Sequence, residues 1–383
     1  MSLLTRVIIG IIVSNIFDVN SRGINSDGNT TSTIISNASL TFVGCFTDFY
    51  PCTRAMSGGS TTSNMNTPTT CAEFCTALGN PYSGTEYGSE CYCSMTSPTV
   101  QSTACTEPCA GDSTQICGGS NALSVMYTSI PSLAATNSTK RGLCWPWNNP
   151  GSSFSLFSPS AIPWLYNWEL WDPRASGVYS SAEYVPMCRT QNEASQVPGY
   201  FSNCYAKHFL GFNEPDLQGG DYISPYDASV LWKQYIQPIK LKCGTALGAP
   251  SVTNGVGPGW GTDWLSQFFS NCTLPSCTFD FLPIHWYGSS VSDFRAYVIN
   301  VHALFPNYPL WITEFQFTDV SSTVTAGYVR GTLQWLDAQP YVARYSMFGP
   351  MNSTNMAGIP NGAMVTDDLS QLTEVGKIYA GLA

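Results

Sequence analysis

The cysteines are distributed very unevenly along this chain, and that distribution constrains its fold more than any other feature. Nine of the fifteen cysteines lie between Cys45 and Cys117, a segment that contains no histidine and no tryptophan. So short a segment buries too little apolar surface to be stable by packing alone, so disulfides must hold it together. Zinc is the competing explanation for its two Cys-x3-Cys pairs, and the lack of histidine argues against it. Because the total is odd, at least one cysteine is unpaired or bonded to another molecule.

The N-terminus and the charge indicate a secreted protein with a neutral partner. Arg6 precedes an apolar stretch, Val7–Phe17, that is too short to span a membrane and suits a signal peptide over residues 1–20. A retained anchor is the alternative. The net charge of −10 argues against a nucleic-acid partner, which requires a basic face. We therefore expect an extracellular or cell-wall-associated protein with no stable membrane association. Sequons, expected at surface positions of a secreted glycoprotein, start at Asn29, Asn37, Asn137, Asn271 and Asn352.

Composition divides the remaining chain into four parts. Residues 21–40 are rich in Ser, Thr, Asn and Gly, which predicts a flexible lead-in. The cysteine-rich module occupies residues 41–128, and residues 129–139 form a short linker. The last 244 residues, 140–383, match the usual size of a (β/α)8 barrel.

Five sequence blocks in the cysteine-rich module resemble the WSC domain, an eight-cysteine module of fungal cell-wall proteins. These blocks are FVGCFTD, TCAEFC, YSGTEYGSECYC, CTEPCAGDSTQICGG and LSVMYT. The chain departs from the pattern at Cys52, an additional cysteine, and at Ser94, where a glycine is usual. The resemblance implies binding of β-1,3-glucan or a related wall glycan, and a spacer without sugar affinity is the alternative. Because the module lacks tryptophan, stacking on a sugar would require Tyr82, Tyr87, Tyr92 or a phenylalanine.

Eight short apolar runs alternate with helical patterns after residue 140, which predicts parallel strands and an α/β (β/α)8 TIM barrel. A helix is expected to begin at Ser224 and Pro225, and Thr262 is a candidate cap for a later helix. Two further helices are expected to bury Phe294, Val298, Val301 and Phe305, and Val329, Leu333 and Leu336. The predicted strand runs are residues 142–147, 164–170, 184–188, 209–213, 246–252, 279–287, 309–315 and 343–350.

Two of these apolar runs end in a carboxylate. FLGFNEPD (209–216) leads to Glu214, and PLWITEF (309–315) leads to Glu314. Pro215 biases Glu214 toward an extended backbone, so we expect the fourth strand to continue to this residue. The carboxyl ends of barrel strands form the active face, and a pair of carboxylates is what cleavage of a glycosidic bond requires.

Six blocks in the C-terminal part resemble glycoside hydrolase family 128, a member of clan A: RGLCWPWNN, YNWELWD, LGFNEPD, LGAPSV, FLPIHWY and WITEFQF. The resemblance implies an endo-β-1,3-glucanase that needs no metal or cofactor. It also implies that Glu214 is the acid/base and Glu314 the nucleophile of a retaining double displacement. Since Glu214 must then be protonated at rest, we predict a raised pKa for its carboxyl.

Other residues near these strand ends are predicted to bind the substrate. By analogy with the clan, Asn213 is expected to bond a sugar 2-hydroxyl, and Tyr287 to orient the nucleophile. Alternation along a strand places His285 on the same face as Tyr287, and Trp286 on the opposite face. Packing inside the fold is the alternative for His285. Phe348 stands where many clan members have tryptophan, so the sequence does not predict how the sugar subsite at that position is built.

Tryptophans supply the candidate stacking surfaces for glucose rings. These are Trp147, Trp168 and Trp286, each of which could equally belong to the core. Asn167, beside Trp168, is a further candidate for substrate binding. Glu169, on the other side of Trp168, is the main rival carboxylate and ranks below the pair.

The cysteines of the C-terminal part predict two disulfides and two free thiols. Cys272 and Cys277 are expected to close a short loop, and Cys204 and Cys243 to join neighbouring strand beginnings, while Cys144 and Cys188 are expected to be buried and free. The sequence thus predicts a secreted, monomeric glucanase with a glycan-binding module. The rival hypotheses are a non-catalytic glycan-binding or sensing protein and a clan A hydrolase acting on another β-glycan.

Overall fold

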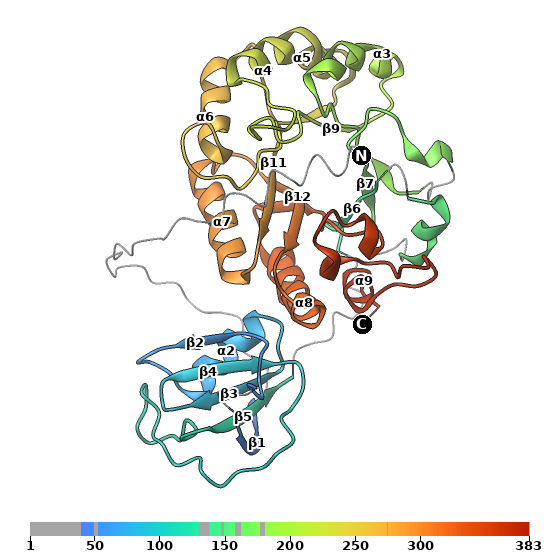
Figure 1. Ribbon diagram of the computed structural model, residues 1–383. Coiled ribbons are helices and arrows are strands. Elements are labelled where there is room, and N and C mark those ends of the chain that lie inside the picture. The colour runs from blue at the N-terminus through green and yellow to red at the C-terminus, as the bar shows by residue number, and fades with distance from the viewer. Residues whose placement is uncertain are drawn as a thin grey trace. The chain divides into compact units, whose positions relative to one another are not determined.

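The computed structural model of the protein describes residues 40–49, 53–129, 138–146, 149–157, 162–176, 181–273 and 275–382. The predictions of a signal peptide, a lead-in and most of the linker concern residues outside these ranges, as does Cys52. The chain divides into two compact units, which are described separately (Figure 1). In the described ranges, no helix combines the length and the apolar character needed to cross a membrane.

The N-terminal unit is an antiparallel sheet with one helix, α2 (Pro68–Ala77). The strand order in the sheet is β1-β5-β3-β4-β2. Thr67 caps α2 and Pro68 begins it, a combination that favours a helix start. The five strands are β1 (Leu40–Thr47), β2 (Ser60–Thr62), β3 (Tyr82–Glu86), β4 (Glu90–Ser94) and β5 (Ala122–Thr128).

Two disulfides join α2 to strand β4, Cys71–Cys91 and Cys75–Cys93. Cys71 and Cys75 lie one helical turn apart, and Cys91 and Cys93 share one face of the strand, so both bonds form side by side. Cys45–Cys105 and Cys109–Cys117 complete the set of four. The prediction of a disulfide-held module is confirmed, and zinc is excluded for these eight cysteines because their thiols are bonded to one another. Among the described residues of this unit, Phe46, Met56, Leu123 and Val125 form a small apolar cluster.

The C-terminal unit contains a strand in each of the eight predicted regions, and every pairing between these strands is parallel. The strands form three sheets, ordered β6-β7-β8, β10-β9 and β11-β12-β13. The result is a mixed α/β fold, and a closed barrel remains a prediction at this point. The strands are β6 (Gly142–Cys144), β7 (Trp164–Tyr166), β8 (Glu183–Tyr184), β9 (His208–Leu210), β10 (Ala246–Gly248), β11 (Leu282–Gly288), β12 (Leu310–Phe317) and β13 (Val342–Tyr345).

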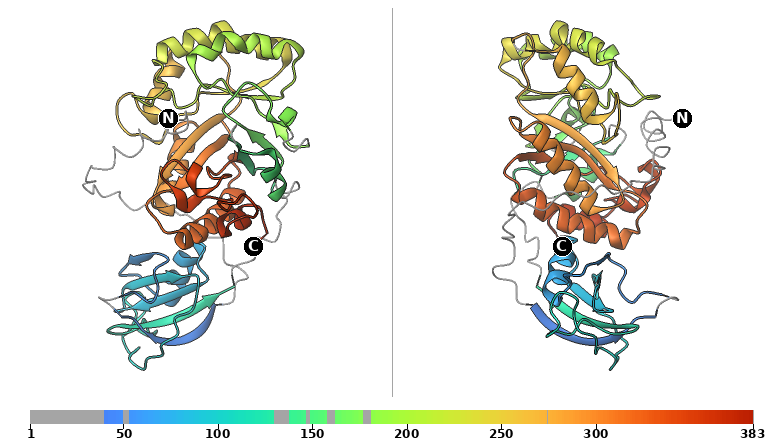
Figure 2. Two further views of the ribbon diagram at one scale, coloured as in Figure 1. Left: turned by 45° about the vertical axis from the view of Figure 1, so that its right-hand side comes forward. Right: turned by 90° about the vertical axis from the view of Figure 1, so that its left-hand side faces the viewer.

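Helices follow the later strands and lie outside them (Figure 1; Figure 2). Ser224 caps the first by accepting a hydrogen bond from the Asp227 amide, as predicted. The prediction for Thr262 was wrong, because α6 is preceded by Trp260 and already includes Thr262. The helices are α4 (Pro225–Leu231), a π-helical segment (Trp232–Ile236), α5 (Gln237–Cys243), α6 (Gly261–Asn271), α7 (Val291–Leu304), α8 (Ser322–Ala338) and α9 (Glu374–Tyr379).

The first three strands are followed mainly by short 3-10 segments, and no clear helical pattern is present in these stretches of sequence. These are Gly151–Leu156, Pro173–Ser176 and Gln191–Gln196, the last of which runs into α3 (Val197–Tyr200) and Phe201–Asn203. Two more lie between β13 and α9, at Ser353–Asn355 and Pro360–Gly362.

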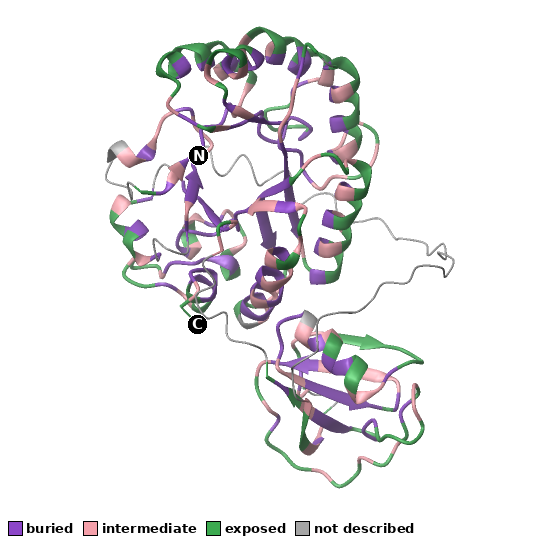
Figure 3. Cartoon of the chain, turned by 180° about the vertical axis from the view of Figure 1, so that it is seen from behind, coloured by how far each residue is buried: buried purple, intermediate pink, exposed green. Residues whose placement is uncertain are grey.

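The helices bury one face and expose the other, as Figure 3 shows by colour. Phe294, Val298 and Val301 of α7 are fully buried, which confirms the predicted face. Phe305 is instead the residue that ends α7, and it is only half-buried. In α8, the predicted apolar residues Val329, Leu333 and Leu336 are also buried.

Aromatic and charged side chains fill the end of the parallel strands where the chain enters them. Phe281 and Trp311 stack with ring centroids 3.9 Å apart, and the Arg344 guanidinium lies 4.3 Å from the Trp311 ring. Glu183 accepts hydrogen bonds from His208 (2.5 Å) and Arg344 (2.6 Å). Burial opposes the charge of Glu183, but these partners outweigh it and lower its pKa to about 2. These contacts give His208 a structural role at this end of the strands.

The two predicted disulfides of this unit, Cys204–Cys243 and Cys272–Cys277, are both present. Cys144 and Cys188 are buried free thiols, also as predicted. Cys144 lies beneath the strand ends, where its Sγ is 3.3 Å from the Met347 carbonyl oxygen.

Candidate active site

Glu214 lies beyond the end of β9 in a left-handed backbone conformation. Its φ is +41°, a region that is unfavourable for a residue with a Cβ. The Glu214 amide donates to the Ser251 carbonyl (2.7 Å), and its own carbonyl accepts from the Leu217 amide (3.0 Å). The prediction that the strand stays extended up to Glu214 was therefore wrong. β9 ends at Leu210, but pairing with the following segment continues to a parallel bridge between Asn213 and Ser251, after which Glu214 begins a turn.

The Glu214 side chain is buried beside an imidazole and a second acid. His285 Nδ1 lies 2.9 Å from Glu214 Oε1, and Glu214 Oε2 has no partner among the described residues. Burial, more than any other cause, raises the pKa of Glu214 to about 7. The hydrogen bond with His285 lowers that pKa, while the nearby Glu314 and Asp216 raise it further. The direction agrees with the predicted one and suits a group that donates a proton near neutral pH.

Glu314 lies within strand β12, which continues for three residues past it to Phe317. Its side chain is buried and accepts hydrogen bonds from several uncharged donors. Tyr287 Oη donates to Oε2 (2.5 Å), Trp168 Nε1 donates to Oε1 (2.7 Å), and Tyr166 Oη lies 3.4 Å from Oε1. These donors take the place of water around the carboxylate and fix its orientation.

His285 lies between the two acids. Its Nδ1 is 2.9 Å from Glu214 and 3.4 Å from Glu314 Oε1. Burial lowers the pKa of this imidazole, but the carboxylates of Glu314 and Glu214 outweigh burial and raise it. Nε2 is buried and has no partner among the described residues. The structure therefore places His285 in contact with both candidate acids, so packing is not its sole role.

Three atoms of this cluster lie within 4.8 Å of one another: one carboxylate oxygen each from Glu214 and Glu314, and a ring nitrogen of His285. Such a set can hold a divalent cation in principle. The hydrogen bonds among these residues account for the arrangement without a cation. The expectation of a metal-free site stays a prediction.

Of the predicted tryptophans, Trp168 lies at this site. Its indole packs between Tyr166 and Phe348, with ring centroids 5.0 and 6.1 Å away. Phe348 also contacts Tyr287, at 5.9 Å. Like Glu214, Trp168 has a positive φ, +59°. Trp147 lies outside the described residues.

Two predicted substrate-binding residues, Trp286 and Asn167, contact other parts of the protein instead of facing the site. Trp286 is buried and packs against Phe294 of α7 (5.2 Å) and Phe317 (5.6 Å), because strand alternation directs it away from His285. It therefore offers no stacking surface to a sugar. Asn167 is fully buried; it accepts from Tyr184 Oη (2.7 Å) and donates to the Trp171 carbonyl (3.1 Å). These bonds hold the loop after β7, so its predicted role in substrate binding was wrong.

Asn213 remains suited to a sugar. It is buried beside Glu214, and its Oδ1 has no partner among the described residues. Glu169, the rival carboxylate, is half-buried, and its nearest described cation is Arg189 at 4.0 Å. None of its described hydrogen bonds or ion pairs reaches Glu214 or Glu314.

Sequence reasoning missed Asp216 and the donor role of Tyr166, at the end of β7, and of Trp168, just after it. Asp216 is fully buried and accepts from Thr253 Oγ1 (2.5 Å) and the Gly261 amide (2.8 Å). It thus ties the turn of Glu214 to the loop before α6. The sequence signal for Asp216 was its position in the NEPD block. For Tyr166 and Trp168, the signal was the i, i+2 spacing, which places two side chains on the same face of a strand.

Two family models match the chain. One, described as glycosyl hydrolase catalytic core, matches residues 142–379, and one for the WSC domain matches residues 42–119. A curated relative, alkali-sensitive linkage protein 1 of Schizosaccharomyces pombe, is 35% identical over 253 residues, which is 63% of this chain and 44% of the relative. The chain therefore spans less than half of the length of that relative.

Solved structures similar to the C-terminal unit are family 128 glycoside hydrolases. A subgroup IV endo-β-1,3-glucanase from Lentinula edodes has 25% identity and a TM-score of 0.56, covering 63% of this chain and 99% of that one. A subgroup III curdlan-specific exo-β-1,3-glucanase from Blastomyces gilchristii, in complex with glucose, has 30% identity and a TM-score of 0.54, covering 64% and 98%. A subgroup I endo-β-1,3-glucanase mutant from Amycolatopsis mediterranei, in complex with laminarihexaose, has 26% identity and a TM-score of 0.53, covering 64% and 100%.

Proposed function

The chain belongs to the glycosyl hydrolase catalytic core family, and from that premise we propose that it is a retaining, endo-acting β-1,3-glucanase whose WSC domain binds wall glycan. The observation that carries the proposal is the buried cluster in which His285 contacts both Glu214 and Glu314. The raised pKa of one carboxyl and the converging donors on the other give the pair two different chemical roles.

In the proposed first step, Glu314 attacks the anomeric carbon and the glycosidic C–O bond breaks. Glu214 gives its proton to the departing sugar oxygen. In the second step Glu214 takes a proton from water, the resulting hydroxide attacks the same carbon, and the ester to Glu314 breaks. One oxygen of each carboxylate lies within 4.8 Å of the other. This supports retention, since retaining enzymes hold the carboxyl groups about 5–5.5 Å apart and inverting enzymes about 6.5–9.5 Å.

The substrate class is proposed from the similar structures. The structures from Lentinula edodes and Amycolatopsis mediterranei are both endo-β-1,3-glucanases, and the second contains laminarihexaose. The similar structure from Blastomyces gilchristii is an exo-acting enzyme. On a long soluble β-1,3-glucan, endo action releases oligosaccharides of many lengths and lowers viscosity early. Accumulation of one small product from the start would instead assign exo action.

We also propose that the three parallel sheets form one closed (β/α)8 barrel. Isolated parallel bridges support this: Met187 pairs with Leu210, Gly248 with Phe281, and Arg141 with Tyr345. These bridges connect each sheet to the next and the last strand to the first. Secretion through the N-terminal apolar segment, and the domain boundaries expected from the sequence, belong to the same proposal.

The test is release of reducing sugar from a linear β-1,3-glucan by the wild-type chain, Glu214→Gln and Glu314→Gln. We expect each substitution to reduce kcat at least about 100-fold, since a positioned acid contributes about 10²–10⁴-fold. Glu169→Gln is the matched control and should keep wild-type activity. Proton NMR of the first-formed anomer tests retention. Equal activity in all four proteins would contradict the assignment of the two acids. No activity in the wild-type chain would favour a non-catalytic glycan-binding protein, whereas activity restricted to another β-glycan would change the substrate.

A further inference from the structure

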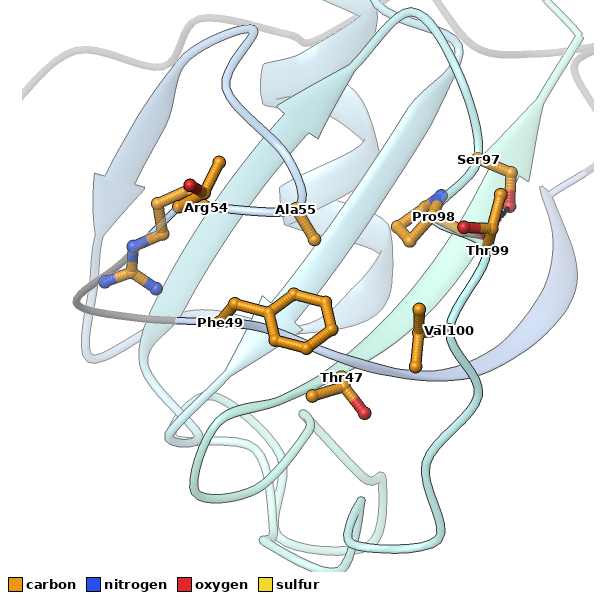
Figure 4. A pocket seen from close by; sticks show the side chains of 9 residues that line it. Thr47, Phe49, Arg54, Ala55, Ser97, Pro98, Thr99 and Val100 are labelled. Atoms are coloured by element: carbon orange, nitrogen blue, oxygen red, sulfur yellow. Dashed lines mark hydrogen bonds between the residues drawn. The ribbon is translucent and has the colours of Figure 1, made fainter.

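The N-terminal unit carries a surface cavity of about 250 Å³ (Figure 4). Its walls come from Thr47 at the end of β1 and Phe49 two residues later, from residues 53–55, and from residues 97–100. The Thr47 amide donates to the Val100 carbonyl (2.8 Å), and the Thr53 amide to the Phe49 carbonyl (3.2 Å). Backbone hydrogen bonds therefore fix the walls relative to one another. Ligand pockets for drug-sized molecules measure about 300–1,000 Å³, so this cavity suits a single small ring.

One wall presents a partly exposed aromatic ring, that of Phe49. Phe49 is 48% exposed, and Val100, also in the wall, is 48% exposed. In Figure 4 the Phe49 ring lies across the cavity, with Thr47 and Val100 beside it. Neighbouring exposed apolar groups mark interaction surfaces, and a flat aromatic face matches the C–H face of a sugar ring.

The polar groups of the cavity are hydroxyls and one guanidinium. Thr47, Thr53, Ser97 and Thr99 can each donate and accept a hydrogen bond. A hydroxyl-rich wall suits a ligand that itself carries many hydroxyls.

The positive charge of Arg54 is compensated inside the protein. Its Nη1 donates to Asp48 Oδ2 (2.5 Å) and Glu86 Oε2 (2.7 Å), both of which are buried, and its guanidinium lies 4.3 Å from the Tyr92 ring. Burial raises the pKa of Glu86 to about 7. One guanidinium thus faces two carboxyl groups and the cluster has no excess positive charge, which favours an uncharged ligand over a phosphate or an acidic sugar.

We propose that this cavity binds one glucose ring of β-1,3-glucan, with the ring stacked on Phe49 and its hydroxyls bonded to the surrounding threonines. The proposal rests on the proposed glycan-binding function of the WSC domain and gives that function a location.

The test uses the full chain carrying Glu314→Gln, so that the polymer is not consumed, and measures its depletion by insoluble curdlan. Phe49→Ala should raise the apparent Kd about 3- to 10-fold, the usual range for loss of an aromatic contact. Phe49→Tyr keeps the ring and should bind like the parent. Phe42→Ala is the matched control, because Phe42 is 60% exposed but outside the cavity.

Equal binding by Phe49→Ala, Phe42→Ala and the parent would overturn the cavity proposal, and so would equal weakening by both alanine substitutions. Thermal unfolding of each variant controls for folding. Hydrolysis of a short soluble laminari-oligosaccharide by the wild-type chain is measured separately and reports on the active site alone. Failure of the cavity proposal is therefore distinguishable from failure of the glucanase proposal, which would show as no hydrolysis by the wild-type chain.

A second inference concerns Trp168 and rests on a separate observation. Its Nε1 lies 2.7 Å from Glu314 Oε1, and an indole N–H can only donate. The left-handed backbone of Trp168 and its packing against Tyr166 and Phe348 hold the donor in this position. We infer that Trp168 is a positioning residue, which orients the Glu314 carboxylate for attack.

Trp168→Phe separates this role from sugar stacking, because it keeps an aromatic face and removes the N–H. We expect kcat on a laminari-oligosaccharide to fall about 10- to 100-fold with KM unchanged, since hydrogen bonds to charged groups contribute about 1.5–3 kcal/mol. Trp168→Ala should lower kcat and also raise KM. An unchanged kcat in Trp168→Phe would overturn the inference and leave stacking as the only role.

Discussion

His285 Nδ1 and Glu214 Oε1 are 2.9 Å apart in an environment closed to solvent, so the protonation of either group affects the other. Burial is the largest cause that raises the pKa of Glu214, and nearby acids add to it, whereas the pKa of His285 is raised by Glu314 and Glu214 against the effect of burial. Asp216 and Glu314 add negative charge to the same small volume. The site therefore retains a proton at a pH where an ordinary carboxyl has lost it.

Activity should decline as the pH rises through about 7. The first proposed step needs Glu214 protonated, and its pKa of about 7 keeps that form populated up to this pH. The measurement is kcat/KM for a laminari-oligosaccharide across pH 4–9. A substrate whose leaving group departs without protonation does not need Glu214 as an acid in the first step. For such a substrate, the rate of the glycosylation step should no longer decline at high pH. A decline that begins near pH 5 would contradict the assignment of Glu214 as the acid.

Stability should fall as the pH rises between about 4.5 and 7. Because Glu214 has a higher pKa in the folded chain than in the unfolded chain, the folded state binds more protons in this interval. Up to about 3 kcal/mol of unfolding free energy is lost in this way. Glu214→Gln should therefore raise the unfolding temperature relative to wild type at pH 8 and match it at pH 4. An equal difference at both pH values would argue against titration as the cause.

Tyr287→Phe should reduce kcat about 10- to 100-fold and leave KM within about 3-fold. The substitution removes the 2.5 Å hydrogen bond to Glu314 Oε2 and keeps the ring against Phe348. Tyr297→Phe is the control, since the described hydrogen bond of the Tyr297 hydroxyl goes to the Thr253 carbonyl (3.4 Å) and not to Glu314. Steady-state kinetics on a soluble oligosaccharide measures both. Equal effects of the two substitutions would mean that the Tyr287 hydroxyl has no particular role.

Reduction of disulfides should unfold the N-terminal unit at a lower temperature than the C-terminal unit. Four disulfides support a core of a few residues in the first, whereas two accompany an extensive core in the second. Each disulfide contributes about 2–4 kcal/mol. Calorimetry with and without dithiothreitol should show one transition shifting strongly and one weakly. Two equal shifts would contradict this account.

The sequence by itself determined where the parallel strands lie in the chain. It also determined which two acids, Glu214 and Glu314, lie near the carboxyl ends of those strands. Strands buried on both faces are continuous apolar runs, and an acid at the end of such a run is conspicuous. It also determined the Cys204–Cys243 and Cys272–Cys277 pairs and the separate character of residues 41–128.

Only the tertiary structure decided which side chains meet the acids. Alternation along β11 put His285 and Tyr287 on one face, but the distance from His285 to both acids depends on how three strands and their turns converge. Likewise, the sequence could not distinguish Trp168, which bonds Glu314, from Trp286, which packs on α7. The left-handed turn at Glu214 could not be predicted from the sequence either, because pairing with Ser251 overrides the preference of a residue before proline for an extended backbone. Local rules fix the face of a strand that a residue occupies, and packing between elements far apart in the chain fixes its partner.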